Sequence, residues 1–216
     1  MVRRRKMVRN FTTEPVDRAA VDRILATAVR APSAGFTQGW GFLVLDAPEN
    51  TARFWDTTFP EERRSEFRYS GMFHAPVIVV PCSNESAYLD RYAEPDKGWT
   101  DRDPARWPVP FWHIDTGFAA MQILNAVVDE GLGALFFGIF GENVPGVRAA
   151  FGIPEDFTPI GAIAIGHPAA GLVPLAVRGG ATLVIVNNQE TPYDDLADVV
   201  LRDPIGDVIP ALVTTG

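Results

Sequence analysis

The sequence predicts a layered domain of helices and strands, of the α/β or α+β class. Segments with helical periodicity alternate with short apolar runs along most of the chain, which is typical of layered folds. The 216 residues are 47% hydrophobic, enough for one substantial core. There is a single cysteine, Cys82, so no internal disulfide framework can take the place of that core.

The first predicted helix covers residues 18–30, where apolar residues recur at helical spacing and Asp17 precedes them as an N-cap. Further helices are predicted over residues 50–71, with a break at Pro60, and over residues 144–151. Continuous apolar runs predict buried strands at the following positions: 40–45, 75–81, 134–140 and 160–166. Residues 83–110 have little periodicity, and such a segment is either a lid or a structural cover over the core.

The longest predicted helix runs from Phe111 to Glu130. Its apolar residues cover more than one face, so it should be buried on several sides. A chain of this size has limited surface to supply that cover, and a second chain is therefore expected to contribute. Beyond residue 168 the pattern adds a short helix over 172–178, a strand over 182–186 and, after a polar turn, a final helix reaching Val200 or beyond.

Composition excludes several classes of function. The net charge of −8 argues against general binding to nucleic acid. No apolar run is long enough to span a bilayer, and no apolar stretch follows the basic start as a signal peptide would require. With one cysteine, a reducing cytoplasm is the expected location. Five of the first nine residues are Arg or Lys, which indicates either a solvated terminus or a site for an anionic group such as a phosphate.

No side-chain cluster with obvious catalytic chemistry occurs. The three histidines, His74, His113 and His167, lack metal-ligand spacing, so no metal site is expected. Cys82 follows a predicted buried strand without an activating partner and is interpreted as a packed thiol. Gly131 and Gly133 begin like a dinucleotide-binding loop, but Phe136 stands where the third glycine should be. The chain is then either a binding module or an enzyme whose cofactor performs the chemistry.

Three segments favour the cofactor enzyme. The first is RKMVRNF at 5–11, and the second is APSAGFTQGW at 31–40. The third is EGLGALFFG at 130–138, followed by FGIP at 151–154 and GHP at 166–168. In type, order and spacing these segments resemble the nitroreductase family over about residues 3–168.

The resemblance implies an α+β fold with an antiparallel sheet flanked by helices. It implies a homodimer, packed through the predicted 111–130 helix, that holds FMN at the interface. NAD(P)H would reduce the flavin, and a small acceptor such as a nitroaromatic or a quinone would be reduced in turn by a ping-pong mechanism. The flavin carries the chemistry, so no catalytic side chain is expected. The cofactor-binding positions that the resemblance implies are Arg5, Lys6, Met7, Arg9, Pro32, Ser33, Phe36, Gln38, Phe136, Phe137 and Gly138.

The sequence departs from the family pattern at three positions. Met7 stands where a serine usually donates to the phosphate, Phe36 where an asparagine usually meets the flavin, and Gly39 where a proline is usual. A phenylalanine can stack on a ring or narrow a pocket, but it cannot donate the amide hydrogen bonds of an asparagine.

Residues from about 171 to 213 resemble instead the C-terminal end of sirtuins, the NAD-dependent deacylases. The matching stretches are LVPLAV at 172–177, LVIVN at 183–187 and TPYDDLAD at 191–198. Deacylase activity is not expected, because the catalytic histidine, the zinc cysteines and the NAD loop of sirtuins have no counterpart in this chain. We therefore expect a nitroreductase-like domain at 1–168 and a sirtuin-like fragment at 169–216, joined by fusion or deletion. A divergent family arm is the alternative reading of this tail.

Three other functions stay open. The protein could bind flavin or a partner with little turnover, because the family's C-terminal arm is not recognisable. It could be a product that folds poorly and has no activity. A nucleic-acid role through the basic start would show strongly salt-dependent binding.

Overall fold

The computed structural model describes residues 4–64, 66–169, 176–177, 179–189, 191, 193–204 and 206. Contacts between Cα atoms divide the chain into two compact units, residues 1–168 and residues 169–216. Each unit is described by itself.

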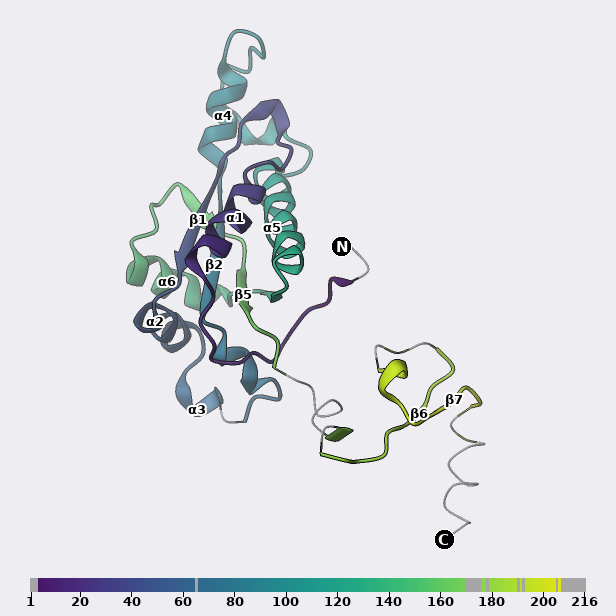
Figure 1. Ribbon diagram of the computed structural model, residues 1–216. Helices are drawn as coiled ribbons and strands as arrows, with labels where there is room; N and C mark the ends of the chain where they lie inside the picture. Colours follow the sequence, from purple (N-terminus) through teal and green to yellow (C-terminus); the bar gives the residue numbers. More distant parts are fainter. Residues whose placement is uncertain are drawn as a thin grey trace. The chain divides into compact units, whose positions relative to one another are not determined.

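Unit 1 is built on an antiparallel sheet whose strands follow the order β1-β2-β5-β3 (Figure 1). The strands are β1 (Trp40–Leu45), β2 (Val77–Asn84), β3 (Gly133–Phe137) and β5 (Ala162–Gly166), and the short β4 (Phe157–Pro159) pairs with the far end of β2. Every pairing between the strands named here is antiparallel. The fold is therefore α+β, and a parallel α/β sheet is ruled out for this unit.

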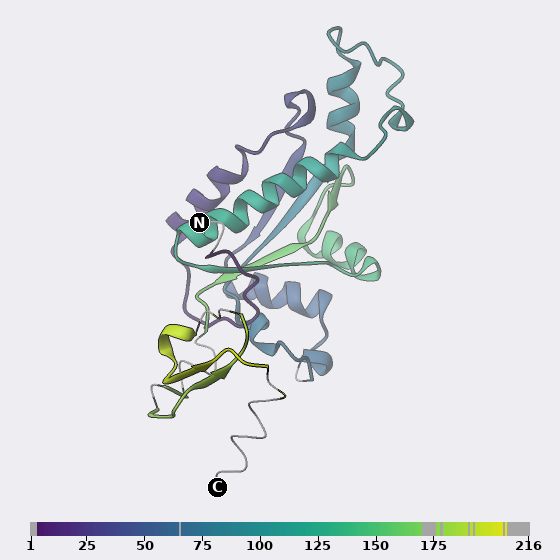
Figure 2. The same ribbon diagram turned by 90° about the vertical axis from the view of Figure 1, so that its right-hand side faces the viewer.

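Two helical layers cover the sheet, one on each face (Figure 2). Helices α1 (Arg18–Ala28) and α5 (Phe111–Asp129) pack together on one face. Helices α2 (Pro48–Thr58) and α6 (Val144–Phe151) pack together over the other. Two shorter helices, α3 (Glu61–Arg64) and α4 (Glu85–Ala93), complete the unit. With cover on both faces, every residue of β2 and β5 is buried, which explains the apolar runs at the start of β2 and along β5.

Most predicted elements are present, with changes at their ends. The Asp17 side chain accepts a hydrogen bond from the Ala19 amide, so it caps α1 as predicted. The break predicted at Pro60 is present, between α2 and α3. The helical stretch predicted at 50–71 is wrong in extent, because α3 ends at Arg64 and is followed only by a 3-10 helix over Ser70–His74. The segment 83–110 contains the regular helix α4, which its short length and mixed composition concealed. Strand β4 was not predicted, since three residues carry almost no periodicity.

Unit 2 contains two short parallel strands, β6 (Val184–Val186) and β7 (Val199–Leu201). The final helix predicted up to Val200 is wrong. A single 3-10 turn (Asp194–Leu196) stands there instead, and the chain then extends into β7 because the apolar run can pair with β6. Most of the helix predicted over 172–178 lies outside the described residues.

Among the described residues, no helix combines the length and apolar character that crossing a membrane requires.

The centre of the sheet sets the stability of unit 1. Ile163 of β5 has no solvent exposure and packs in the core cluster beneath α1 and α5. Replacing it with alanine removes buried methyl groups and leaves a cavity, so Ile163→Ala should lower the free energy of unfolding by about 2–5 kcal/mol. Urea denaturation measures this. Val29→Ala, at a 44% exposed position, should change the free energy of unfolding by no more than about 0.5 kcal/mol. Equal effects of the two substitutions would contradict the packing described.

Candidate functional site

The basic N-terminal segment lies along strand β3. Met7 forms a parallel bridge with Ala134, and the Val8 amide donates to the Ala134 carbonyl at 2.9 Å. The segment thereby covers the outer edge of β3, which would otherwise expose unpaired backbone groups. Further along the same strand are Phe136 and Phe137. Two of the three segments singled out in the sequence are therefore brought together within one chain.

The cations of this segment have no carboxylate partner among the residues that the structure describes. Arg5 is half-buried, while Lys6 and Arg9 are exposed. Within the described part of the chain, none of the three forms an ion pair with Asp or Glu. Three unneutralised cations in five residues of an acidic protein leave a strong local positive potential, which suits an anionic ligand.

Arg68 joins this group and was missed by the sequence analysis. The guanidinium carbons of Arg9 and Arg68 lie 5.4 Å and 5.5 Å from the centroid of the same ring, that of Tyr69. The two segments meet because the Phe11 amide donates to the Gly71 carbonyl at 3.0 Å. No local motif marks Arg68, since its position depends on this pairing between residues 60 apart in the chain.

Met7 contributes packing rather than a donor. Its side chain contacts both core clusters, one on each face of the sheet. A thioether cannot donate a hydrogen bond, so the serine that the family usually has here is not replaced in function.

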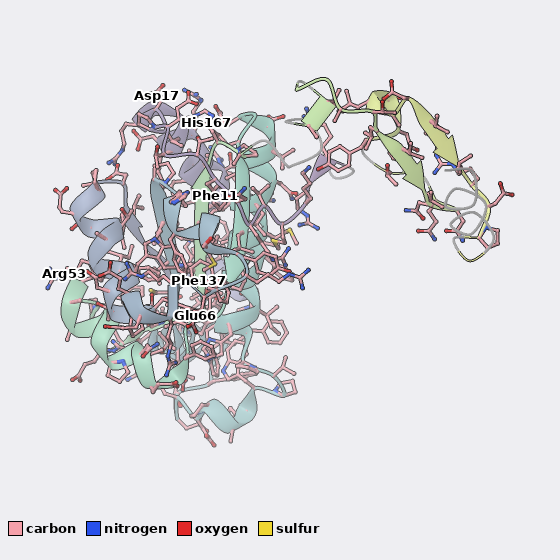
Figure 3. The ribbon with its side chains drawn as sticks, turned by 90° about the horizontal axis from the view of Figure 1, so that it is seen from below. Phe11, Asp17, Arg53, Glu66, Phe137 and His167 are labelled. Carbon is pink, nitrogen blue, oxygen red and sulfur yellow. The ribbon has the colours of Figure 1, made fainter. Side chains whose placement is uncertain are left out.

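The end of β3 combines a fixed aromatic base with open space. The Phe137 ring stacks on Trp55, with centroids 5.4 Å apart, inside unit 1 (Figure 3). Phe136 packs over Gly161, where an added Cβ would lie only 2.5 Å from its ring. Gly138, directly after the strand, is exposed, and a Cβ there would meet no atom within 4 Å. The backbone beyond β3 is therefore accessible to a ligand.

The loop of residues 32–38 adopts an uncommon backbone conformation. Phe36 and Gln38 have φ angles of 54° and 53°, in the left-handed region that costs residues other than glycine about 1 kcal/mol or more. The Gln38 amide donates to the Ser33 hydroxyl oxygen at 2.9 Å, and the Gln38 side chain donates to the Val29 carbonyl at 3.3 Å. Pro32 and Phe36 face solvent, and the Phe36 side chain is 78% exposed.

One chain does not bring this loop to the basic segment. The Ala34 amide bonds to Asp115, near the start of α5, whereas Ala134 follows the end of that helix. At 1.5 Å per residue the two points are roughly 20 Å apart along the helix. A single chain therefore does not bring all three predicted segments together.

Helix α5 presents an apolar stripe to solvent. Phe118 and Met121 are 48% and 46% exposed, and Ile114, one turn before them, is partly exposed. Their spacing places these three side chains on one face of the helix, opposite the face that packs on the sheet. Large apolar side chains grouped in this way mark an interaction surface.

The other candidates from the sequence are structural. Among the described residues, no group of His, Cys, Asp or Glu could hold a metal ion. His113 accepts or donates a hydrogen bond at 2.8 Å to the buried Ser83 hydroxyl, and burial lowers the pKa of its imidazole. Cys82 is buried in β2, and that burial raises the pKa of its thiol to about 11.

Comparison with known proteins defines the class of protein. The fold is similar to that of a solved nitroreductase-like protein from Exiguobacterium sibiricum in complex with FMN, with a TM-score of 0.59 and 21% identity over 91% of this chain and 94% of that one. A Methanothermobacter thermautotrophicus protein, named putative NADH dehydrogenase/NAD(P)H nitroreductase, is 28% identical over 171 residues, which are 78% of this chain and 75% of that protein.

The Nitroreductase family model matches residues 2–167. The chain therefore belongs to the nitroreductase family and is an oxidoreductase.

A second, shorter match is of a different kind. The NAD-dependent protein deacetylase 2 of Streptomyces coelicolor is 53% identical over 59 residues, which are 27% of this chain and 24% of the deacetylase. The chain spans only about a quarter of that protein, so the match does not indicate deacetylase activity for this chain. Residues 168–216 lie outside the nitroreductase match.

The raised pKa of Cys82 predicts a thiol of low reactivity. With a pKa of about 11, only ~0.1% of the thiol is ionised at pH 8, against roughly a quarter for an ordinary cysteine. An aromatic disulfide reagent should therefore label the folded protein at least a hundredfold more slowly than the protein in urea, as followed by absorbance. Equal rates would show that Cys82 is accessible and activated, contrary to its burial in β2.

Proposed function

We propose that the protein is an FMN-dependent oxidoreductase that passes hydride from NAD(P)H to a small acceptor, such as a nitroaromatic or a quinone, by a ping-pong mechanism. The observation that carries the proposal is the basic segment held along the start of β3, whose cations pair with no carboxylate among the described residues, together with the open backbone at Gly138 beyond the other end of that strand. The E. sibiricum structure, which shares the fold, contains FMN, and the M. thermautotrophicus relative is named for NAD(P)H.

The residues present fit FMN by the chemistry of their donors. A phosphate dianion requires cationic donors, and Arg5, Lys6 and Arg9 supply them on one short extended segment. Arg68 adds a further guanidinium over the same Tyr69 ring as Arg9. The accessible backbone after Phe137 suits the polar edge of a flat ring, and fixed donors there would stabilise negative charge on it. When bound, FMN supplies the hydride chemistry, so the protein contributes binding, orientation and electrostatics.

A homodimer is part of the proposal. The exposed stripe of α5 is apolar enough to be buried by a second copy, and the two-fold symmetry of most dimers would set the stripes against each other. Two antiparallel α5 helices would bring the 32–38 loop of one chain to the basic segment of its partner. The two parts of the site that lie at opposite ends of one α5 would then face each other.

Phe36 is proposed to contact the acceptor or the flavin ring. Its side chain stays 78% exposed although its backbone is strained, so packing within the chain does not explain its position. An aromatic ring favours flat apolar acceptors through stacking. It offers no hydrogen bond to the flavin, which lowers affinity relative to the family's usual asparagine.

For residues 169–216 we propose a sirtuin-like fragment attached to a nitroreductase-like domain of residues 1–168. Support comes from the short deacetylase match and from the parallel pairing of β6 and β7, which differs from the antiparallel sheet of unit 1. A second candidate function, flavin binding with little turnover, is favoured by Met7 and Phe36, which remove two hydrogen bonds to the cofactor.

The proposal predicts flavin absorbance in the visible spectrum of the protein, after reconstitution with FMN and desalting, that bleaches on addition of NADPH or NADH. Arg9→Glu should weaken FMN binding about tenfold or more, because it replaces a charge-assisted hydrogen bond by repulsion. Fluorescence titration with FMN measures this. Arg53→Glu, on α2, is the matched control and should leave the affinity unchanged (Figure 3). No retained flavin in the wild type would contradict the proposal, whereas retained flavin without turnover would favour the second candidate.

The dimer predicts a concentration-dependent mass. Phe118→Arg places a charge in the middle of the apolar stripe, and burying an unpaired charge is unfavourable by several kcal/mol. Sedimentation should therefore show a dimer for the wild type and mainly monomer for Phe118→Arg, with loss of FMN. Ala52→Arg is the control, because Ala52 is an exposed residue of α2, on the other side of the sheet from α5. This variant should remain dimeric. A monomeric wild type would exclude a site formed by the 32–38 loop of one chain and the basic segment of its partner.

A further inference from the structure

The 32–38 loop is held from behind by one buried carboxylate. The Ala34 amide donates to Asp115 Oδ2 at 2.7 Å, and the Tyr88 hydroxyl donates to the same oxygen at 2.8 Å. Asp115 is 2% exposed and Tyr88 is fully buried. Because two donors from different elements share this buried oxygen, it joins the loop, α4 and α5.

Tyr88 is suited to the role of a permanent donor. Burial, together with the hydrogen bond to Asp115, raises the pKa of its hydroxyl above the usual range, so the proton is retained. A further link comes from Arg91, one turn along α4, whose Nε donates to the Gly35 carbonyl at 3.0 Å. The loop is therefore bonded at two consecutive residues to α4 and α5.

Close packing leaves the loop little room to move. A Cβ added at Gly39 would lie 2.6 Å from the Tyr88 ring, and one added at Gly35 would lie 2.8 Å from the Tyr92 ring. Any larger residue at Gly39, including the proline usual in the family, would displace Tyr88. The glycine at this position is thus explained by the tyrosine that bonds to Asp115.

The segment of residues 83–110 supports this arrangement. Its Trp107 ring is the centre of an aromatic cluster, with ring centroids 6.0 Å from Tyr88, 4.4 Å from Tyr92 and 6.0 Å from Trp112. The cluster fixes α4 against the start of α5, so the two donors from α4 are held in place. Of the two readings of this segment, lid or structural cover, these contacts favour a cover that stiffens the loop.

We propose that Asp115 is a positioning residue that, together with Tyr88, fixes the strained 32–38 loop so that Ser33 and Phe36 are presented to the flavin and its acceptor. The inference rests on the proposed function and adds a residue that touches neither the cofactor nor the substrate. Residues held at unfavourable φ persist only where their surroundings determine them, and Asp115 supplies the determining contact at Ala34.

The test compares Asp115→Ala with Asp115→Asn and Thr116→Val in the full-length protein. The alanine variant should bind FMN about tenfold more weakly, lose intensity in the visible circular dichroism of the bound flavin and raise KM for the acceptor more than it lowers kcat. Asn keeps an accepting oxygen for Ala34 and Tyr88, so it should restore FMN affinity to within about threefold of the wild type. Hydrogen exchange of the Ala34 amide, measured without FMN, should be slow in the wild type and fast in Asp115→Ala.

Thr116→Val is the matched control. Thr116 is the next residue on α5, is fully buried and donates to the Trp112 carbonyl within its own helix. Its loss should lower the melting temperature without changing flavin affinity or exchange at Ala34. If Asp115→Ala fails to fold, Tyr88→Phe removes one of the two hydrogen bonds to Asp115 and keeps the ring, and should weaken FMN binding a few fold.

The outcomes separate the two proposals. If the wild-type protein binds no FMN, the proposed function is wrong, and so is the assignment of flavin as the ligand that the 32–38 loop contacts. The positioning role would be overturned if Asp115→Ala kept the wild-type flavin affinity and the wild-type exchange rate of the Ala34 amide. If the alanine variant does not fold, the same result for Tyr88→Phe would overturn it. In either case flavin binding by the wild type would still stand. Loss of affinity in Thr116→Val equal to that in Asp115→Ala would also overturn the positioning role, because the effect would then follow from stability alone.

Discussion

The burial of β2 and β5 on both faces is the constraint on which the rest of unit 1 depends. Two strands without an exposed residue require helical cover above and below, which α1 with α5 and α2 with α6 provide. With both faces covered, the backbone that remains accessible lies at the margins of the sheet. The outer edge of β3 is covered by the extended basic segment, whose charges are thereby set near the start of the strand. The position of the cations is a consequence of sheet burial.

Helix α5 connects this arrangement to the proposed dimer. One of its faces packs on the sheet, while Phe118 and Met121 lie on the opposite face and remain about half exposed. The same helix carries Asp115 near its first turn and leads into β3 at its end. A single rigid element thus determines the distance between the loop and the basic segment, and that distance makes one chain insufficient for the proposed site.

Sequence patterns were reliable where periodicity was long and local. The α1 cap at Asp17, the α6 helix and the buried run of β2 follow from spacing and residue type alone. Sequence patterns failed where pairing with a distant segment decided the conformation. The apolar residues around Val200 suit a helix or a strand equally well, and pairing with β6 makes them β7. Helix α4 was hidden because it is short and of mixed composition, and its aromatic contacts are with Trp107, which lies outside the helix.

The same division applies to the site and to the protein as a whole. The sequence by itself determined the layered pattern of helices and strands, the family resemblance that implies an α+β fold, the basic segment and the departures at Met7, Phe36 and Gly39, because these depend on residue type and local order. The antiparallel pairing of the strands then decided for α+β. Only the tertiary structure joined Arg68 to Arg9, showed that Gly39 makes room for Tyr88 and connected Asp115 to the loop. These contacts link residues far apart in the chain, and no local pattern encodes a distance between side chains that meet only after the sheet and its helices have packed.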